Sequence, residues 1–316
     1  MSDKLFEVFY PSKGDNSMQP ALLQKARSNE PRPLLVALHT WSFDHLSCSW
    51  EPYRSCCEKL DWHLIYPAFR GANNKPEACG SELVVADIVS ALEYAKSVCN
   101  VSEQQVYLAG GSGGGHASLL TAGIHPELWT AVSAWCPISD IAAWHRECEN
   151  HCRNYHDHIE AVCGGDPQTC QEARNEAVKR SPATYLPSAA GKVVIDINTG
   201  IHDGHTGSVP VSHAFRAYNL LCAPQERFAE SDIDFIVQNE VIPEHLKYSG
   251  ESEPLFGEKN ILLRRVSGCV RLTIFEGGHN ILPAAACAWL ANQHKPLTPD
   301  WQLCNGESDK AMELTR

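Results

Sequence analysis

The sequence lacks long apolar segments. No stretch of the 316 residues approaches the roughly 18 consecutive apolar residues that a membrane-spanning helix requires. The first residues, MSDKLFE, carry charges where a secretory signal peptide would have an apolar run. These absences predict a soluble chain without a signal peptide as given, and they do not decide between a cytoplasmic protein and one secreted after processing.

Positive charge is also scarce. Lysine and arginine together number 26 against 38 aspartate and glutamate residues, and the formal net charge is −12. The phosphate groups of nucleic acids and anionic lipids are bound by clustered lysine and arginine, and the sequence contains no basic stripe. We therefore expect no nucleic-acid partner and no membrane partner.

Cysteine, in contrast, is abundant. The chain has 14 cysteines, and many of them lie in apolar runs, where a thiol behaves as a small hydrophobic group. Cys148, Cys152, Cys163 and Cys170 lie in a polar, histidine-rich segment and could form one or two disulfides, whose pairing the spacing does not define. With 43% hydrophobic and 20% charged residues, the chain has a globular composition and can bury a core without disulfides or metals.

Strand and helix patterns alternate along the chain. Residues 34–38 (LLVAL) form a continuous apolar run, typical of strands buried on both faces of a parallel sheet. Residues 84–98 repeat apolar side chains at helical spacing, which predicts an amphipathic helix packed on that sheet. The alternation favours βαβ crossovers and a mostly parallel sheet. Further strands are expected at 5–10, 62–66, 106–108, 129–135, 192–198 and 271–275.

Two segments depart from this alternation. Residues 141–185 are rich in His, Cys, Arg and Glu, and we interpret them as a helical insertion that forms a lid or a substrate wall. A plain surface excursion is the alternative interpretation. Residues 223–264 are interpreted as a second, polar insertion.

One motif carries chemistry. The pattern G-x-S-x-G occurs at Gly110, Ser112 and Gly114, between a strand pattern and a helix-like run that begins at Gly113. This context is typical of a nucleophile elbow, in which a serine takes strained backbone angles and its neighbours must lack a Cβ. Serine is a weak nucleophile at neutral pH, so Ser112 would need a base and an acid that orients the base. A structural glycine-rich turn is the alternative.

A base and an acid follow Ser112 at strand exits. Asp203 lies past the strand at 192–198, and His279 lies past the strand at 271–275. The exits of parallel strands share one edge of the sheet, and the order serine, acid, histidine is that of α/β-hydrolases. We therefore predict Ser112, Asp203 and His279 as the catalytic residues. Fallback acids are Asp196, Asp232 and Asp234, and rival histidines are His39, His116, His202, His205 and His213.

Two backbone N–H groups are expected to bind the oxyanion. Gly113, the residue after the serine, would supply one, and Thr40 or Trp41 in the loop after the strand at 34–38 would supply the other. Side chains near this edge could stack on or hydrogen-bond a substrate, or could equally serve as core and rim. These side chains are His39, Trp144, His202 and His205.

No cofactor is expected, and no metal site is predicted. Two groups of residues offer metal-ligand side chains, but neither has a firm metal spacing. One group is His202-Asp203-Gly204-His205, and the other is Cys148, Cys152, His156 and His158.

These motifs together resemble the catalytic domain of the prolyl oligopeptidase family, within the α/β-hydrolase superfamily. The resemblance implies that residues 1–316 form one α/β-hydrolase domain, a mostly parallel central sheet flanked by helices, with helical insertions over the active-site edge. It also implies Ser112 as nucleophile, Asp203 as acid and His279 as base. The matching pieces are residues 110–115 (GGSGGG), the helix that contains Asp87, residues 180–182 (RSP), Asp203 and residues 277–279 (GGH).

The resemblance further implies a serine hydrolase that forms an acyl-enzyme. The chain has no room for the β-propeller of oligopeptidases, and an insertion widens the interval between Asp203 and His279. We therefore expect a carboxylesterase that acts on a small-molecule or carbohydrate ester, such as an acylated carbohydrate or an aryl ester. A prolyl oligopeptidase-like serine peptidase and a non-catalytic, hydrolase-like binding protein are the alternatives.

Overall fold

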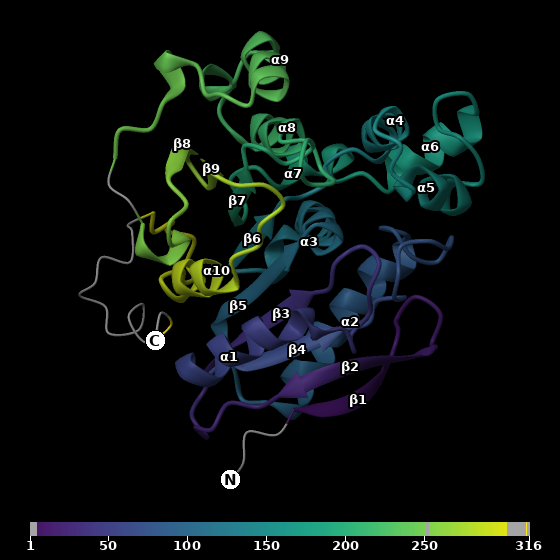
Figure 1. The fold of residues 1–316 in the computed structure, drawn as a ribbon. Coiled ribbons are helices and arrows are strands. Elements are labelled where there is room, and N and C mark those ends of the chain that lie inside the picture. Colours follow the sequence, from purple (N-terminus) through teal and green to yellow (C-terminus); the bar gives the residue numbers. More distant parts are fainter. Residues whose placement is uncertain (1–4, 251–252, 302–313, 315–316) are drawn as a thin grey trace.

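A nine-stranded sheet organises the chain (Figure 1). The structure, a computed structural model, describes residues 5–250, 253–301 and 314. The strands lie in the order β1-β2-β4-β3-β5-β6-β7-β9-β8. The strands from β4 to β9 in this order run parallel, and β1, β2 and β8 pair antiparallel at the two ends. Their bounds are β1 Phe6–Pro11, β2 Met18–Gln24, β3 Arg32–Leu38, β4 His63–Pro67, β5 Val101–Gly111, β6 Ala131–Trp135, β7 Val194–Gly200, β8 Ile261–Ser267 and β9 Val270–Phe275.

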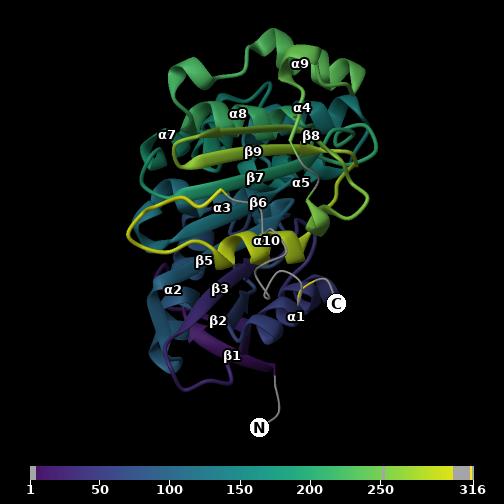
Figure 2. The same ribbon diagram turned by 90° about the vertical axis from the view of Figure 1, so that its left-hand side faces the viewer.

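Helices cover both faces of the sheet (Figures 1 and 2). Successive residues of β3 point to opposite faces: Leu34 and Val36 pack with α2, α3 and α8, whereas Leu35 packs with α1 and α10. The apolar run at 34–38 is therefore a strand buried on both sides, as the sequence predicted. None of the described helices is long and apolar enough to cross a bilayer. The helices are α1 Glu51–Leu60, α2 Glu82–Val98, α3 Gly113–Ile124, α4 Ile141–Asn150, α5 Tyr155–Cys163, α6 Gln171–Lys179, α7 Leu186–Ala189, α8 Ser212–Leu221, α9 Glu230–Asn239 and α10 Pro283–Ala291.

Two strands lie where the sequence predicted only connections. β2 forms because a turn folds the chain back on β1; the N–H of Ser12 donates to the carbonyl of Ser17, and the N–H of Asn16 donates to the carbonyl of Ser12. β8 pairs with β9 through a turn at Gly268, whose φ of +55° favours glycine. The expected insertion at 223–264 therefore ends where β8 begins. β8 is partly exposed and contains two arginines, so its sequence lacks the continuous apolar run that marks a buried strand.

The segment at 141–185 folds mainly into α4, α5 and α6, which stand together at one end of the molecule (Figure 1). They pack around a hydrophobic cluster that also includes Trp41 and Cys79, and Cys148 and Cys163 contribute buried side chains to it. Both cysteines are free thiols, as are Cys152 and Cys170. The disulfides that the sequence allowed among these four cysteines are not formed, and buried apolar side chains hold these helices together.

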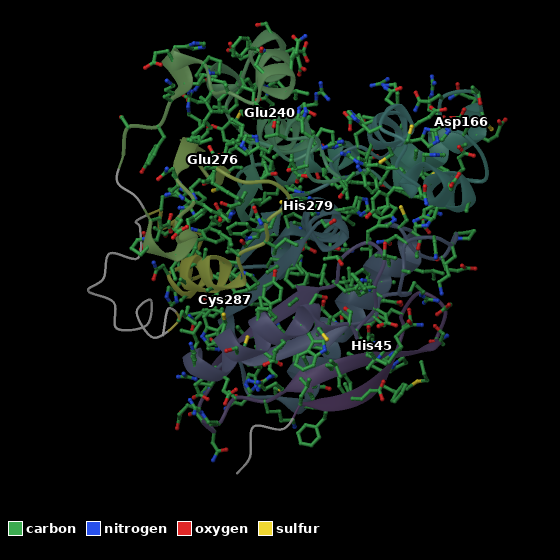
Figure 3. All side chains as sticks on the ribbon, in the orientation of Figure 1. His45, Asp166, Glu240, Glu276, His279 and Cys287 are labelled. Atoms are coloured by element: carbon green, nitrogen blue, oxygen red, sulfur yellow. The ribbon has the colours of Figure 1, made fainter. Side chains whose placement is uncertain are left out.

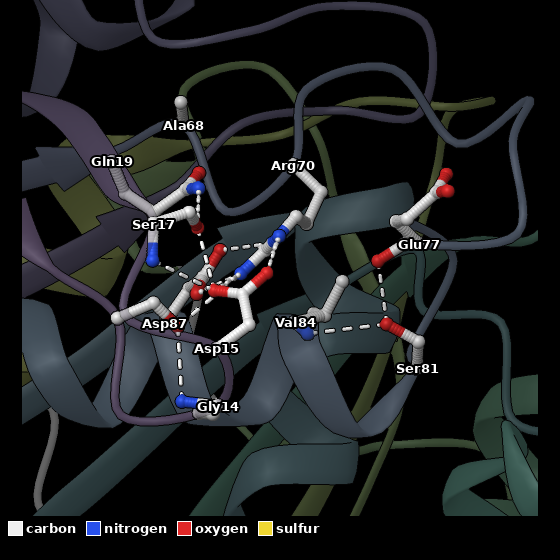
Figure 4. A network of polar contacts seen from close by, with 12 residues as sticks. Gly14, Asp15, Ser17, Gln19, Ala68, Arg70, Glu77, Ser81, Val84 and Asp87 are labelled. Carbon is white, nitrogen blue, oxygen red and sulfur yellow. Dashed lines mark hydrogen bonds and ion pairs between the residues drawn. The ribbon is translucent and has the colours of Figure 1, made fainter.

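The loop after β4 is anchored by an arginine that bridges three segments (Figure 4). Arg70 makes two hydrogen bonds, at 2.7 and 2.9 Å, to Asp87 of α2, whose side chain is fully buried. It also bonds to Asp15 in the turn between β1 and β2, at 2.8 and 3.0 Å. This network fixes the start of a loop that continues into the candidate site.

Candidate active site

Ser112 lies on the turn between β5 and α3. Its φ of 57° and ψ of −120° are sterically unfavourable for a residue with a side chain. The N–H of Ser112 donates to the carbonyl of Trp135 at 2.8 Å, which ties the turn to the end of β6. Among the described residues, the Ser112 hydroxyl makes no capping bond to α3, so it lies at the start of this helix without satisfying one of its N–H groups.

Glycines let the segments around this turn approach closely. A Cβ at Gly110 would lie 2.5 Å from the carbonyl oxygen of Gly114. A Cβ at Gly114 would in turn collide with the carbonyl oxygen of Leu38, at the end of β3. The strand–turn–helix arrangement therefore requires both glycines, which is the reason that the sequence motif contains them.

Asp203 and His279 meet although 75 residues separate them. Nδ1 of His279, in the loop after β9, lies 2.7 Å from Oδ2 of Asp203, in the loop after β7. The other carboxylate oxygen accepts the N–H groups of Gly204 and Val209 at 3.0 and 3.1 Å. A neutral imidazole that donates from Nδ1 keeps a lone pair on Nε2, which is the tautomer that a general base needs.

A glycine that the sequence analysis did not single out lies against this pair. A Cβ at Gly207 would collide with Oδ1 of Asp203 and would lie 2.6 Å from the Cβ of His279. The loop after β7 can therefore pass over the acid–histidine pair only because residue 207 has no side chain.

The loop that carries His279 packs over the ends of β5 and β6 (Figure 3 labels His279). The side chain of Ile281 occupies the space that a Cβ at Gly111 would fill. The thiol of Cys136, just after β6, donates to the carbonyl of Asn280 at 3.4 Å. These contacts bring the histidine loop against the turn of Ser112. In the part of the chain that the structure describes, no hydrogen bond joins the Ser112 hydroxyl to His279.

The loop after β3 brings one of the two expected oxyanion donors to Gly113. A Cβ at Gly113 would lie 2.6 Å from the backbone nitrogen of Trp41, so this nitrogen and the first turn of α3 are in contact. Among the described residues, the Trp41 N–H has no acceptor, and the nitrogen that lies beside Gly113 is that of Trp41 and not that of Thr40. The geometry thus favours Trp41 over Thr40 as the partner of Gly113.

Asn73 holds this loop in place and was not predicted as a site residue. Its N–H donates to the carbonyl of Trp41 at 2.9 Å, and its Oδ1 accepts the N–H of Cys79 at 2.7 Å. Because Oδ1 must face that donor, Nδ2 points the other way, toward Gly113. Nδ2 is buried and has no partner within the described ranges. A single asparagine in a loop has no pattern that the sequence could reveal.

Aromatic side chains from α4 and α5 pack on Trp41. The ring of Trp144 lies edge-on to Trp41 at 4.6 Å and is stacked with Tyr155 at 5.2 Å. The indole N–H of Trp41 donates to His158 at 3.2 Å. We call Trp144, Tyr155 and His158 the aromatic wall. The wall connects the helical segment at 141–185 directly to the loop of the candidate oxyanion donor.

Two of the four expected substrate-binding side chains are part of the core. His39 is fully buried, stacks on Phe69 at 3.9 Å, and places both ring nitrogens 2.8 Å from carbonyl oxygens. Trp144 is 1% exposed and donates to the carbonyl of Ser208. Packing around the oxyanion loop buries both side chains, which argues against contact with a substrate. Contact of these two residues with a substrate stays a prediction.

The other two, His202 and His205, lie at the surface beside the site. His202 is bound on both nitrogens, by Glu240 at 2.6 Å and by Glu276 at 2.7 Å (Figure 3 labels both glutamates). Nε2 of His205 lies 2.6 Å from the carbonyl oxygen of Val237. Contact of these histidines with a substrate stays a prediction.

Asp196, one of the fallback acids, and the rival histidines have other partners. Asp196 forms a buried ion pair with Arg271 inside the sheet, at 2.7 Å. Nε2 of His116 lies 2.8 Å from the carbonyl oxygen of Arg180, and burial lowers the pKa of this imidazole to about 4. His213 pairs with Glu147 at 2.8 Å. Asp203 and His279 are thus the acid and the histidine that face each other beside Ser112.

The sheet topology and the strained turn after β5 are those of the α/β-hydrolase fold. Residues 81–233 match the model of the prolyl oligopeptidase family. This range begins at α2 and includes Ser112 and Asp203. The chain has the α/β-hydrolase fold of the prolyl oligopeptidase family.

Solved structures with the same fold include three peptidases. Oligopeptidase B from Leishmania major is 13% identical, with a TM-score of 0.56 over 87% of this chain and 33% of its own. A puromycin-hydrolyzing peptidase from Mycobacterium tuberculosis is 13% identical, with a TM-score of 0.61 over 92% of this chain and 40% of its own. The acylaminoacyl peptidase of Pyrococcus horikoshii is 14% identical, with a TM-score of 0.52 over 69% and 34%. The present chain thus spans about a third of the length of these proteins, and the likeness is one of fold.

Proposed function

We propose that this chain is a serine hydrolase that works through an acyl-enzyme. The observation that carries the proposal is the 2.7 Å bond between His279 and Asp203 in loops packed against the turn of Ser112. The hydroxyl of Ser112 attacks the substrate carbonyl, and Nε2 of His279 takes its proton. Asp203 keeps the imidazole in the correct tautomer and stabilises the imidazolium. Since catalytic bonds often tighten only when substrate binds, the missing bond between Ser112 and His279 forms in the complex.

The tetrahedral intermediate carries a negative oxygen that needs fixed donors. The N–H groups of Gly113 and Trp41 supply them, and the dipole of α3 adds positive potential at the same place. When the intermediate collapses, His279 returns the proton to the leaving group. Water then attacks the acyl-enzyme by the same route, which regenerates Ser112.

The finer proposal concerns the leaving group. The sequence favoured a carboxylesterase, with a peptidase as the alternative. The matched structures are named as peptidases: an oligopeptidase, an acylaminoacyl peptidase and a puromycin-hydrolyzing peptidase. On this likeness we propose that the substrates are peptides or aminoacyl amides. An ester substrate remains the second candidate, because an acyl-enzyme mechanism serves both bonds.

The first prediction concerns Ser112. Replacing Ser112 with Ala removes the nucleophile, so labelling by a fluorophosphonate probe disappears and kcat falls by roughly 10⁴- to 10⁶-fold. The matched control is Ser118→Ala, which removes a buried hydroxyl from the same helix and leaves labelling intact. Turnover that survives in the Ser112 variant contradicts the mechanism. A folded wild-type protein that neither labels nor turns over any substrate supports the non-catalytic alternative.

A second measurement decides between the leaving groups. Peptidyl and aminoacyl p-nitroanilides are compared with acetyl and feruloyl esters, each with wild type and with the Ser112 variant. Cleavage of the amides supports a peptidase, whereas cleavage of the esters alone supports the carboxylesterase that the sequence favoured.

A further inference from the structure

A group of metal-ligand side chains joins α4 to α5, away from the catalytic residues. It contains His145 of α4 with His156 and Glu160 of α5. One ligand atom from each residue lies within 4.8 Å of the other two. His156 and Glu160 share one face of their helix because they are four residues apart.

The distances in this group fit a tetrahedral ion. Nε2 of His145 lies 3.1 Å from Oε1 of Glu160, and Nδ1 of His156 lies 3.8 Å from the same oxygen. With zinc–ligand bonds of about 2.0–2.1 Å, neighbouring ligand atoms of a tetrahedron are about 3.4 Å apart. Small side-chain movements would therefore place three ligands around one ion. Glu160 and His156 are partly exposed, which leaves the fourth position open to water.

The buried imidazole of His145 has a polar atom that the protein alone does not satisfy. His145 is fully buried, and its Nδ1 has no hydrogen-bond partner among the described residues. If the neutral ring donates from Nε2 to Glu160, Nδ1 is left as a bare acceptor. A cation on Nε2 reverses the tautomer, so that Nδ1 carries the proton and can donate to Asp166, whose Oδ1 lies 3.7 Å away. A carboxylate behind a ligating histidine is the usual second partner of a metal site.

The local charge also favours a cation. Asp157 lies 3.3 Å from Nδ1 of His156, so three carboxylates surround the two imidazoles. Figure 3 shows Asp166 at the outer end of the helical segment, away from His279.

We propose that His145, His156 and Glu160 bind one zinc ion, with Asp166 as the hydrogen-bond partner of His145. The ion fastens α4 to α5. Trp144 directly precedes His145 and Tyr155 directly precedes His156, so the same two helices carry the aromatic wall against Trp41. The site is structural, and its existence does not depend on the proposed hydrolase activity.

The test uses the full-length protein, stripped of metal by a chelator and titrated with cobalt(II) and with zinc. We expect one equivalent of cobalt(II) with visible d–d bands and no thiolate-to-cobalt charge-transfer band, because the ligands are nitrogen and oxygen. Zinc should displace the cobalt and raise the melting temperature. A charge-transfer band would assign the ion to cysteines and overturn the proposal.

Variants identify the ligands. His156→Ala and Glu160→Gln change partly exposed side chains and should abolish the cobalt spectrum, while Asp166→Asn should weaken zinc binding by about 10- to 100-fold. His245→Ala, which removes an exposed histidine that also has a carboxylate neighbour, is the matched control and should bind as wild type does. The proposal is wrong if His156→Ala and Glu160→Gln both still bind cobalt(II). It is also wrong if the wild-type protein binds cobalt(II) no more tightly than these two variants do.

Discussion

At the scale of single residues, the candidate site depends on groups that hold the reacting atoms rather than on those atoms alone. Gly207 leaves room for the acid–histidine pair, and Asn73 positions the backbone of Trp41 beside Gly113. Both residues allow two loops to pack closely. Substitutions at these positions would therefore displace the oxyanion donors or the imidazole of His279 by fractions of an ångström. Displacements of about 1 Å can cost a hundredfold in rate.

Asn73 provides a test of this dependence. In Asn73→Asp the side chain keeps an oxygen for the Cys79 N–H but loses the buried Nδ2 beside Gly113, and a new negative charge faces the oxyanion position. We expect kcat/KM to fall by about 10- to 100-fold, mainly through kcat. The control is Asn74→Asp, an exposed neighbour whose change should leave the kinetics unaltered. Equal kinetics for the two variants would remove Asn73 from the site.

His116 predicts a pH dependence of stability. Burial lowers the pKa of its imidazole from 6.5 to about 4 in the folded protein. The unfolded chain therefore binds a proton between these values that the folded chain does not, and the free energy of unfolding falls as the pH falls. Between pH 7 and pH 5 this group should remove about 2 kcal/mol.

The measurement is urea denaturation at both pH values for wild type and for His116→Gln. Glutamine can donate to the carbonyl of Arg180 but does not titrate. The variant should lose about 2 kcal/mol less than wild type over this interval. The comparison with wild type cancels the other buried histidines, and parallel pH profiles would show that His116 is not buried as the structure has it.

At the scale of elements, the loop after β4 depends on the network of Arg70. Arg70→Gln leaves the carboxyl group of Asp87 buried without its cation, and burial already raises the pKa of that group. We expect the free energy of unfolding to fall by about 3–5 kcal/mol, the usual cost of breaking a buried pair on one side.

Arg27→Gln is the matched control, because the exposed side chain of Arg27 pairs with Asp61 at the surface and such pairs contribute little. The double variant Arg70→Met with Asp87→Leu should recover much of the loss, since no buried charge remains. A single Arg70 variant as stable as wild type would refute the network.

At the scale of the whole molecule, packing without disulfides holds the fold together. Each described cysteine is a free thiol, and Cys57, Cys136 and Cys287 are fully or almost fully buried. A reducing agent should therefore leave the melting temperature unchanged. With a thiol reagent, the exposed Cys48 and Cys152 should react first, and the buried thiols should react only on unfolding. A fall of the melting temperature on reduction would contradict this.

The sequence by itself determined the local features of this protein. The apolar run at 34–38 and the motif around Ser112 predict a buried strand and a strained turn, because strand pattern and glycine spacing are properties of neighbouring residues. The sequence also predicted Ser112, Asp203 and His279 at strand exits, since parallel strands end at one edge of the sheet.

Only the tertiary structure decided what distant segments do to one another. It placed the Trp41 nitrogen beside Gly113, buried His39 and Trp144, put Gly207 and Asn73 at the candidate site, and brought His145 close to the α5 side chains. Each of these outcomes depends on atoms from loops far apart in the chain coming within a few ångströms. Local pattern carries no information about such contacts, because they follow from how the whole sheet and its helices pack.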